Sequence, residues 1–317
     1  MPHEKDIRGD SLLLERLKSR RARLILRDRI LASLRATFRA AGFVEVETPL
    51  LLATVAPEEH IVPIRCADRF LATSPELQMK ELVAAGFDRI FQITRSFRAG
   101  ERGSRHVPEF TILEWYRTAG LLDALRLDLE MLLSQAAHDA VGSRLVTWQG
   151  RSVDFSPPYT VIPVREVFLR HAGWDPVAQF DADRFDLDLV ERVEPHLGRG
   201  KPEILAFYPL PQASLARPHP RDPQVALRLE LYVEGMELAN GFMELSDASI
   251  QEERFRCSSA AILGAGRQPP PMPDAFLATL PHLPDCVGIA LGIDRLVMLL
   301  TDASDIDQVR TFTPDEA

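Results

Sequence analysis

The stretch from Phe91 to Arg117, FQITRSFRAGERGSRHVPEFTILEWYR, most constrains the fold of this chain. In its first run Phe91 and Ile93 face one way while polar residues face the other, a pattern typical of half-buried β-strands. A loop rich in glycine and arginine follows, and Pro108 ends it. The chain then returns as a second strand, which carries Phe110, Ile112, Glu114 and Tyr116 on one face. We therefore expect a long antiparallel hairpin.

The tip of this hairpin is basic. It carries Arg98, Arg102, Arg105 and His106 within a few residues of each other. Each guanidinium group can donate paired hydrogen bonds to phosphate oxygens, so the loop suits a polyanionic ligand. The local pattern leaves an alternative open, which is a solvated basic loop on an ordinary hairpin.

Composition narrows the class of protein. The 317 residues are 46% hydrophobic and 26% charged, as in ordinary globular proteins, and the formal net charge of −9 does not point to a nucleic-acid partner. Cys66, Cys257 and Cys286 are far apart and form no CxxC pair. There is no signal-peptide pattern and no apolar run long enough for a membrane span. We expect a cytoplasmic protein with no membrane partner.

The N-terminal segment is predicted to be a helix from about residue 11 to 41, which Gly42 ends. Basic residues crowd it, and a solvated face is the expected role for most of them. They are Arg16, Lys18, Arg20, Arg21, Arg23, Arg27 and Arg29.

Other elements follow in an irregular order. A strand is expected over 43–47, strands over 204–208 and 227–245, and helices over 75–85, 121–141 and 249–264. The region 142–200 is the least informative, with helices near 164–171 and 183–196. Strands without βαβ alternation favour an α+β fold, an antiparallel β-sheet flanked by helices. No P-loop and no strand-linked GxGxxG motif is present.

Three segments carry a family resemblance. FRAGE, RHVPEF and LEWY, within about 91–117, resemble motif 2 of the class II aminoacyl-tRNA synthetases, most closely the lysyl branch. GIALGIDRLVML, about 288–299, resembles motif 3, and GFVEVETPLL, about 42–51, resembles motif 1. The resemblance implies one class II synthetase catalytic domain over residues 1–317. It also implies a homodimer, with Pro49 of motif 1 at the interface.

The resemblance implies that ATP and Mg²⁺ activate an amino acid. Negative charge builds on the phosphates as pyrophosphate leaves, so fixed positive charge is needed. Arg98 would hold the α-phosphate and the substrate carboxylate, and Arg295 the γ-phosphate, as the two catalytic residues. Phe110 would stack on adenine. The implied ATP-binding set is Arg98, Ala99, Gly100, Glu101, Arg105, His106, Val107, Phe110, Glu237, Leu238, Gly292 and Arg295.

Two positions depart from the lysyl pattern. Arg98 is followed by Ala99-Gly100-Glu101, so the glutamate is displaced by one residue from the usual R-N-E-G. Val107 stands where the family has asparagine. Both changes affect the expected contacts with adenine, and neither removes a positive charge.

A metal pair is implied by GMELANGFMEL, in which Glu237 and Glu244 stand seven residues apart. Hard carboxylate ligands suit Mg²⁺ that bridges phosphates. Two exposed glutamates on a hairpin are the alternative.

A lysine-like substrate has two ammonium groups, and their burial requires carboxylates or other strong acceptors. At matching positions the resemblance implies a substrate-binding set, although Glu76 could be only a first-turn helix charge and Glu114 and Tyr116 ordinary strand residues. The set is Ser74, Pro75, Glu76, Glu114, Tyr116, Asn240, Glu244 and Ala290.

The length of the sequence before motif 1 and two pocket positions indicate which members of the family the chain resembles most. Motif 1 begins near residue 42, so we expect no anticodon-binding domain before it. Ser74 stands where lysyl-tRNA synthetases have alanine and Ala290 where they have glycine. The chain resembles the short synthetase paralogues that attach β-lysine to a lysine of translation elongation factor P, with tRNA an improbable acceptor. The alternatives are a truncated lysyl-tRNA synthetase acting on tRNA or free amines, and a catalytically silent regulatory paralogue.

Overall fold

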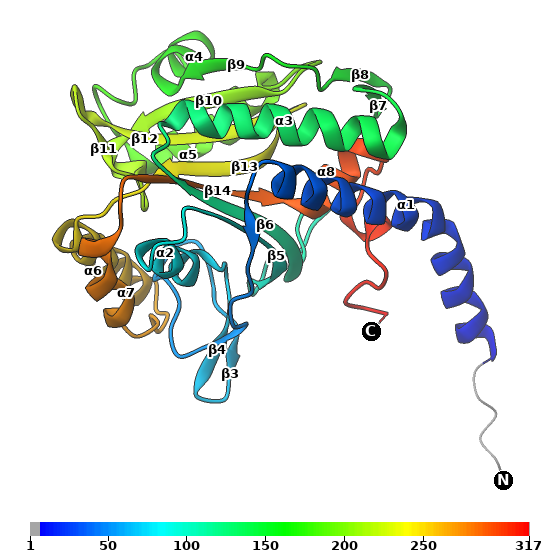
Figure 1. Ribbon diagram of the computed structural model, residues 1–317, viewed down its shortest axis with the longest axis horizontal. Coiled ribbons are helices and arrows are strands. Elements are labelled where there is room, and N and C mark those ends of the chain that lie inside the picture. The colour runs from blue at the N-terminus through cyan, green and yellow to red at the C-terminus, as the bar shows by residue number, and fades with distance from the viewer. Residues whose placement is uncertain (1–6, 317) are drawn as a thin grey trace.

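The computed structural model describes residues 7–316, and its centre is a nine-stranded sheet (Figure 1). The strand order is β1-β5-β6-β14-β13-β12-β10-β9, and β11 pairs with β12. β1 and β9 run parallel to their neighbours, whereas the inner pairs are antiparallel. The strands are Val44–Glu45, Arg89–Phe97, Glu109–Thr118, Cys286–Gly292, Met236–Met243, Asp222–Val233, Glu203–Pro209, Thr160–Pro163 and, for β11, Pro218–His219. The α+β prediction is confirmed.

Two small sheets lie outside the central one. β2 (Leu51–Leu52), β4 (Arg69–Leu71) and β3 (Arg65–Cys66) form one, and β7 (Leu145–Trp148) and β8 (Arg151–Asp154) form the other. Both consist of short antiparallel strands.

The predicted hairpin is present as β5 and β6, with Gln92 opposite Glu114 and Ser96 opposite Phe110. The expectation of a half-buried hairpin is wrong in one respect. Gln92 and Ser96, on the polar face of β5, are themselves buried. Other residues therefore cover both faces of the hairpin.

Three helices cover one face of the central sheet (Figure 1): α1 (Ile7–Ala40), α3 (Leu122–Val141) and α8 (Ile293–Leu300). Apolar side chains from β6 and β14, such as Trp115 and Ile289, pack there with α1 residues such as Phe38. Burial of this size supplies most of the driving force for folding.

The opposite face is only partly covered. α2 (Glu76–Ala84), α6 (Ala248–Gly264) and α7 (Asp274–Thr279) pack around one end. α4 (Val164–His171) and α5 (Ala182–Asp188) pack against the β9–β10 end. Between these two groups, residues of β6, β13 and β14 line an accessible cavity.

The predicted helices are confirmed, although the one expected over 183–196 is interrupted. α5 gives way to a π-helical turn, Leu189–Val193, and a 3₁₀ turn, Glu194–His196. Three strands in 145–163 were not predicted, because short edge strands carry little periodic signal. The remaining 3₁₀ turns are Leu210–Gln212, Leu280–His282 and Ile306–Val309.

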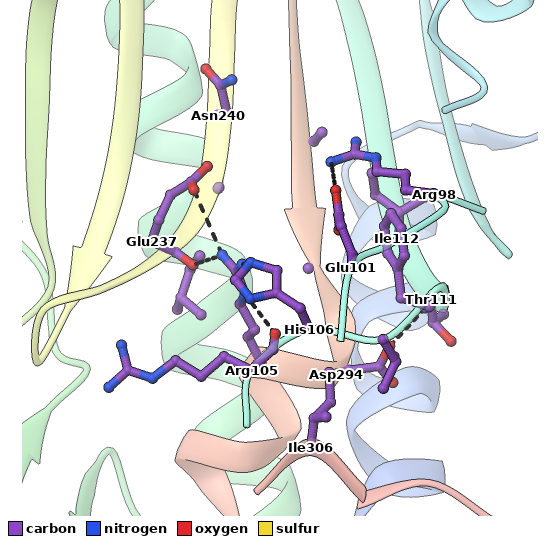
Figure 2. A pocket seen from close by; sticks show the side chains of 17 residues that line it. Arg98, Glu101, Arg105, His106, Thr111, Ile112, Glu237, Asn240, Asp294 and Ile306 are labelled. Atoms are coloured by element: carbon purple, nitrogen blue, oxygen red, sulfur yellow. Dashed lines mark hydrogen bonds and ion pairs between the residues drawn. The ribbon is translucent and has the colours of Figure 1, made fainter. Parts of the chain in front are cut away.

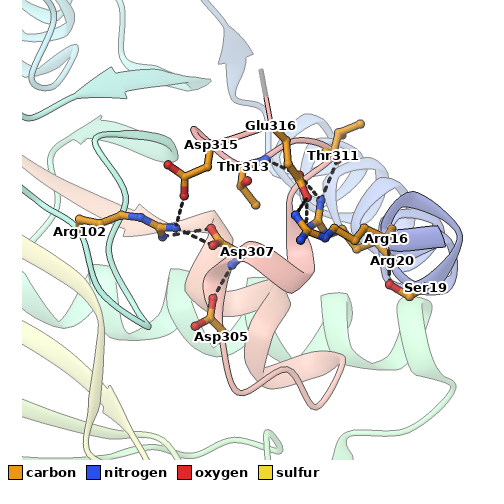
Figure 3. Close-up of polar contacts among 10 residues, drawn as sticks. All are labelled: Arg16, Ser19, Arg20, Arg102, Asp305, Asp307, Thr311, Thr313, Asp315 and Glu316. Atoms are coloured by element: carbon orange, nitrogen blue, oxygen red, sulfur yellow. Dashed lines mark hydrogen bonds and ion pairs between the residues drawn. The ribbon is translucent and has the colours of Figure 1, made fainter. Parts of the chain in front are cut away.

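The expectation of a solvated basic face on α1 is wrong for one stripe of the helix, of which Figure 3 shows Arg20. Arg20 donates to Glu316 at 2.6 and 2.9 Å, and Arg23 donates to the Thr301 carbonyl at 3.3 Å. Arg27 donates to Asp294 at 2.6 Å. Spacings of three and four residues put these arginines on one side of the helix. There they bind residues 294–316, which we call the C-terminal segment.

The C-terminal segment also holds the motif 2 loop (Figure 3). Arg102 donates to Asp307 at 2.8 and 3.2 Å, and the Ile306 amide donates to the Ser104 carbonyl at 2.9 Å. These contacts fix the loop that stands over the open sheet face. No helix within residues 7–316 has the length and apolar character needed to cross a membrane.

Candidate active site

A cavity of about 240 Å³ opens on the uncovered sheet face (Figure 2). The motif 2 loop, β6, β13, β14 and the start of α8 all contribute to its wall. Its lining includes ten residues of the ATP-binding set predicted from sequence: Arg98, Glu101, Arg105, His106, Val107, Phe110, Glu237, Leu238, Gly292 and Arg295.

Arg98 lies at the end of β5 on one side of this cavity. Its Nε donates to the Thr73 carbonyl at 3.3 Å, and its guanidinium carbon lies 5.0 Å from the centre of the Phe110 ring. Glu101 Oε1 is 3.9 Å from Nη1, a loose ion pair. Most of the guanidinium's hydrogen-bonding capacity is therefore available to an anion.

Arg295 lies on the other side, in the first turn of α8, where Gly292 is the N-cap. Its Nη1 donates to the Glu237 carbonyl at 2.7 Å and lies 3.6 Å from Glu237 Oε2, while Nη2 contacts His106 Nε2. Burial, and then the charges of Arg295, Arg98 and Arg105, lower the pKa of His106 to about 4. At neutral pH His106 is thus uncharged and can accept from Arg295.

The start of α8 is held from behind by α1. Arg27 donates to Asp294 at 2.6 Å and to Thr111 Oγ1 at 2.8 Å, and the Thr111 amide donates to Asp294 at 2.7 Å. One arginine thereby joins the motif 2 strand to the motif 3 helix. This link fixes the backbone from which Arg295 projects.

A β-bulge decides which side chains of β13 face the cavity. Leu231 pairs with Ala239 but Tyr232 pairs with Glu237, so Leu238 is the extra residue. On a regular strand Glu237 and Asn240 would point to opposite faces, because side chains alternate. The bulge puts both on the cavity wall.

The predicted metal pair is split by the structure. Glu237 lines the cavity with 38% of its side chain exposed, whereas Glu244 is 1% exposed and lies 2.5 Å from Lys80 Nζ. Burial, and then the charge of Glu230 on the adjacent strand, raise the pKa of Glu237. Glu230, and not Glu244, is therefore the carboxylate whose charge acts on Glu237. No cluster of three metal-ligating side chains occurs within the described part of the chain.

A cluster of buried and half-buried polar side chains, called the acidic pocket below, lies beside the cavity along β6 and β14. Ser74 Oγ donates to Glu114 at 2.5 Å, Tyr116 OH donates to Glu114 at 3.0 Å, and the Glu76 amide donates to Ser74 Oγ at 3.0 Å. Ala290 lies opposite Glu114 in the sheet and also lines the cavity, so it marks the junction of the two spaces. The floor of the pocket is a carboxylate held by two hydroxyl groups.

Burial, and then repulsion by Glu76, raise the pKa of Glu114 to about 8. Burial also raises the pKa of Glu244 to about 7, although the Lys80 ammonium opposes it. A pocket in which carboxyl groups bind protons this readily has a deficit of positive charge. A ligand with ammonium groups would supply that charge.

Comparisons with known proteins cover nearly the whole chain. The family model of class II tRNA synthetases (D, K and N) matches residues 3–316. The chain belongs to this family. It is 37% identical over 311 residues to the elongation factor P–(R)-β-lysine ligase of Klebsiella pneumoniae, covering 93% of this chain and 95% of the relative.

Two further relatives bear the same name. The protein from Pectobacterium carotovorum is 37% identical over 317 residues, with 93% of this chain and 96% of the relative covered. That from Salmonella typhi is 36% identical over 327 residues, with 93% and 95% covered. Full-length similarity of this kind includes all three synthetase motifs.

Most of the predicted site residues of this class II synthetase gather in the two adjoining spaces. Asn240 and Ala290 line the cavity, and Ser74, Glu76, Glu114, Tyr116 and Glu244 form the pocket. Ala99, Gly100 and Pro75 do not line the cavity. Val107 lines it but is 1% exposed and packs in the core, so its departure from asparagine removes a polar side chain there.

Two buried polar groups of the synthetase site were not predicted. Lys80 lies between Glu76 and Glu244, and the i, i+4 spacing from Glu76 on a predicted helix was the available signal. Glu230 accepts from Tyr208 at 2.5 Å, Tyr232 at 2.7 Å and Arg228 at 2.5 Å. Strand alternation indicated only that Arg228, Glu230 and Tyr232 share a face.

Proposed function

We propose that this protein is an ATP-dependent ligase that activates (R)-β-lysine, or lysine, and transfers it to a lysine ε-amino group of elongation factor P. One observation carries the proposal: an arginine-lined cavity and a carboxylate-lined pocket meet at Ala290 and Glu114 on one sheet face. A substrate with a reacting carboxylate at one end and ammonium groups at the other fits this division. The names of the relatives support the acceptor.

In the proposed first step, a carboxylate oxygen of the amino acid attacks the α-phosphorus of ATP. A C–O–P link forms and pyrophosphate leaves. Arg98 binds the α-phosphate and the attacking carboxylate, and Arg295 binds the γ-phosphate, so both oppose the negative charge of the transition state. Phe110 provides a flat apolar surface for adenine beside Arg98. Glu101, Arg105 and His106 complete the wall.

For Mg²⁺ we propose Glu237 as a ligand, because its side chain faces the cavity. Glu244 fits less well than the sequence suggested, because it is paired with Lys80. When bound, the ion neutralises charge on the phosphates, and the carboxylates of this chain orient it.

The ammonium groups of the substrate are assigned to Glu76, Glu114 and Glu244, with Ser74, Tyr116 and Asn240 as neutral partners. In the second step an uncharged lysine amine attacks the adenylate carbonyl. An amide bond forms, the C–O–P link breaks, AMP leaves, and the amine loses a proton. The reaction thus regenerates the free site.

We also propose a single cytoplasmic catalytic domain that forms a homodimer through motif 1. Val44, Leu50 and Leu51 are 53%, 38% and 47% exposed beside Pro49, which is apolar surface of the kind that two-fold contacts bury. Sedimentation at micromolar concentration tests this, and a 35.6 kDa species alone would contradict it.

The acceptor is tested with labelled β-lysine and ATP, with elongation factor P and total tRNA in separate reactions. We expect label on the protein and almost none on tRNA. Label on tRNA alone would favour a truncated lysyl-tRNA synthetase. If no amino acid supports ATP–pyrophosphate exchange, the result favours a silent paralogue. We do not expect this outcome, because Arg98 and Arg295 are both present.

A further inference from the structure

A buried lysine joins two carboxylates of the acidic pocket. Lys80 stands one helical turn after Glu76 in α2, and its side chain is 1% exposed. Its Nζ lies 2.6 Å from Glu76 Oε1 and 2.5 Å from Glu244 Oε2. The lysine therefore bridges helix α2 to the end of strand β13.

The bridge keeps this lysine charged. Burial alone would lower the pKa of Lys80, but attraction by Glu244 and Glu76 outweighs it, and the pKa is raised. An ammonium group without such partners would be far too costly to bury. The charged group holds each carboxylate by one oxygen.

The second oxygen of Glu244 is free. Oε1 is buried and has no hydrogen-bond partner among residues 7–316. A Cβ atom at Gly288 would come within 2.4 Å of that oxygen and 2.2 Å of the Tyr116 ring, so only glycine at this position lets the oxygen and the ring lie against the strand. A buried carboxylate oxygen without a hydrogen-bond partner suits a cationic group of a ligand.

We propose that Lys80 is a positioning residue that fixes the spacing between Glu76 and Glu244, so that the pocket selects substrates by the distance between their two amino groups. This inference rests on the function proposed above. Each carboxylate presents one oxygen to the substrate and the other to Lys80. Because α2 and β13 belong to different packed layers, the bridge sets how far apart those two oxygens lie.

A purely structural ion pair is the competing role, and three amino acids distinguish the two. β-Lysine and ornithine have the same spacing between their amino groups but differ in the distance to the carboxylate. α-Lysine has a spacing one carbon longer. If Lys80 fixes the spacing, its loss changes the preference between β-lysine and α-lysine. The preference between β-lysine and ornithine stays unchanged.

The experiment measures kcat/KM in ATP–pyrophosphate exchange for the three amino acids with wild type and Lys80→Met. Lys18→Met is the matched control, because Lys18 is 69% exposed and pairs only with Glu15 among the described residues. We expect the β-lysine to α-lysine ratio to fall about tenfold in Lys80→Met, the scale of one methylene group. The ornithine ratio and the KM for ATP should stay within about twofold.

Lys80→Arg decides the matter if Lys80→Met does not fold, because it keeps the positive charge. Its planar, longer side chain cannot reproduce the same bridge, so the same ratio should fall in a folded protein. An unchanged ratio in either folded variant overturns the inference, as does a wild-type ratio near one. Absence of exchange with all three amino acids in wild type would instead overturn the proposed function, and the inference with it.

Discussion

The cavity and the pocket lie side by side on one sheet face, yet they are built in opposite ways. In the cavity the side chains of Arg98 and Arg295 are 25% and 20% exposed, and the loose ion pair of Arg98 leaves donors available. In the pocket the side chains of Lys80 and Glu244 are 1% exposed and tightly paired. Partly exposed arginines can adjust their positions to a large polyanion that enters from solution. Buried ion pairs hold fixed positions, so they favour a small ligand of one particular shape.

The largest effect should come from the open side. Arg98→Ala or Arg295→Ala removes positive charge aimed at the transition state, and we expect a loss of about a hundred- to a thousandfold in exchange activity. Circular dichroism and thermal melting should show an intact fold.

Arg102→Ala is the matched control, because Arg102 stands in the same loop but pairs with Asp307. Its activity should fall less than about threefold, since an exposed ion pair contributes little and the hydrogen bond from the Ile306 amide to the Ser104 carbonyl still holds the loop. Near-normal exchange in folded Arg98→Ala would contradict the role given to this arginine.

A smaller effect should follow when the support behind the cavity is removed. Arg27→Gln takes one charged hydrogen-bond partner from both Asp294 and Thr111, and we expect about 2 kcal/mol of lost stability. The KM for ATP should rise because the start of α8 is less well fixed. Denaturant unfolding and exchange kinetics measure the two quantities. Arg29→Gln, at an exposed position on the same helix, should change neither.

On the closed side the expected effect depends on pH. The pKa values of Glu114 and Glu244 are raised to about 8 and about 7, so below these values the carboxyl groups are protonated and bind ammonium groups poorly. The KM for β-lysine should fall about tenfold as pH rises from about 6 to 8. Glu114→Gln should flatten the upper part of this profile. A KM independent of pH would contradict the raised values.

The raised pKa of Glu114 also predicts how the free energy of unfolding changes with pH. Because the folded-state pKa of Glu114 lies above its unfolded value, the folded state binds the proton more tightly. Stability without substrate is therefore fully present below about pH 4.5, the ordinary glutamate value, and decreases as pH rises through about 8. Bound diamino acid should reduce this loss, which thermal melting with and without β-lysine can test.

The sequence predicted the open side better than the closed side for a physical reason. Alternation and helical spacing locate β5, β6 and α2, and the motif resemblance identified Arg98, which follows β5, and Arg295, which lies in α8. The bulge at Leu238 follows no periodicity, so the grouping of Glu237 with Asn240 could not be read. The bridge between Lys80 and Glu244 depends on how α2 packs against β13, which a single sequence does not specify.

Arg27 is a residue whose environment the sequence predicted wrongly. Its position in a basic run indicated a solvated face, because exposed arginines are the common outcome. The structure instead gives it Asp294 and Thr111 as partners, from segments far away in the sequence. Partners contributed by distant segments decide whether a charge is solvated, and they appear only when the chain is folded.

The smallest effect tests the junction of the two regions. Ala290 lies opposite both Glu114 and Asn240 and lines the cavity, so its methyl group lies between the cavity and the pocket. Ala290→Gly adds the space of one methyl group, worth about 1 kcal/mol, and should raise activity with α-lysine relative to β-lysine roughly fivefold. Ala136→Gly is the control, because Ala136 packs in the core on α3 and does not line the cavity. It should lose stability without a change in preference. If the pocket alone selects the amino acid, Ala290→Gly must leave the KM for ATP unchanged. A change in the KM for ATP would instead mean that the methyl group acts on ATP binding in the cavity.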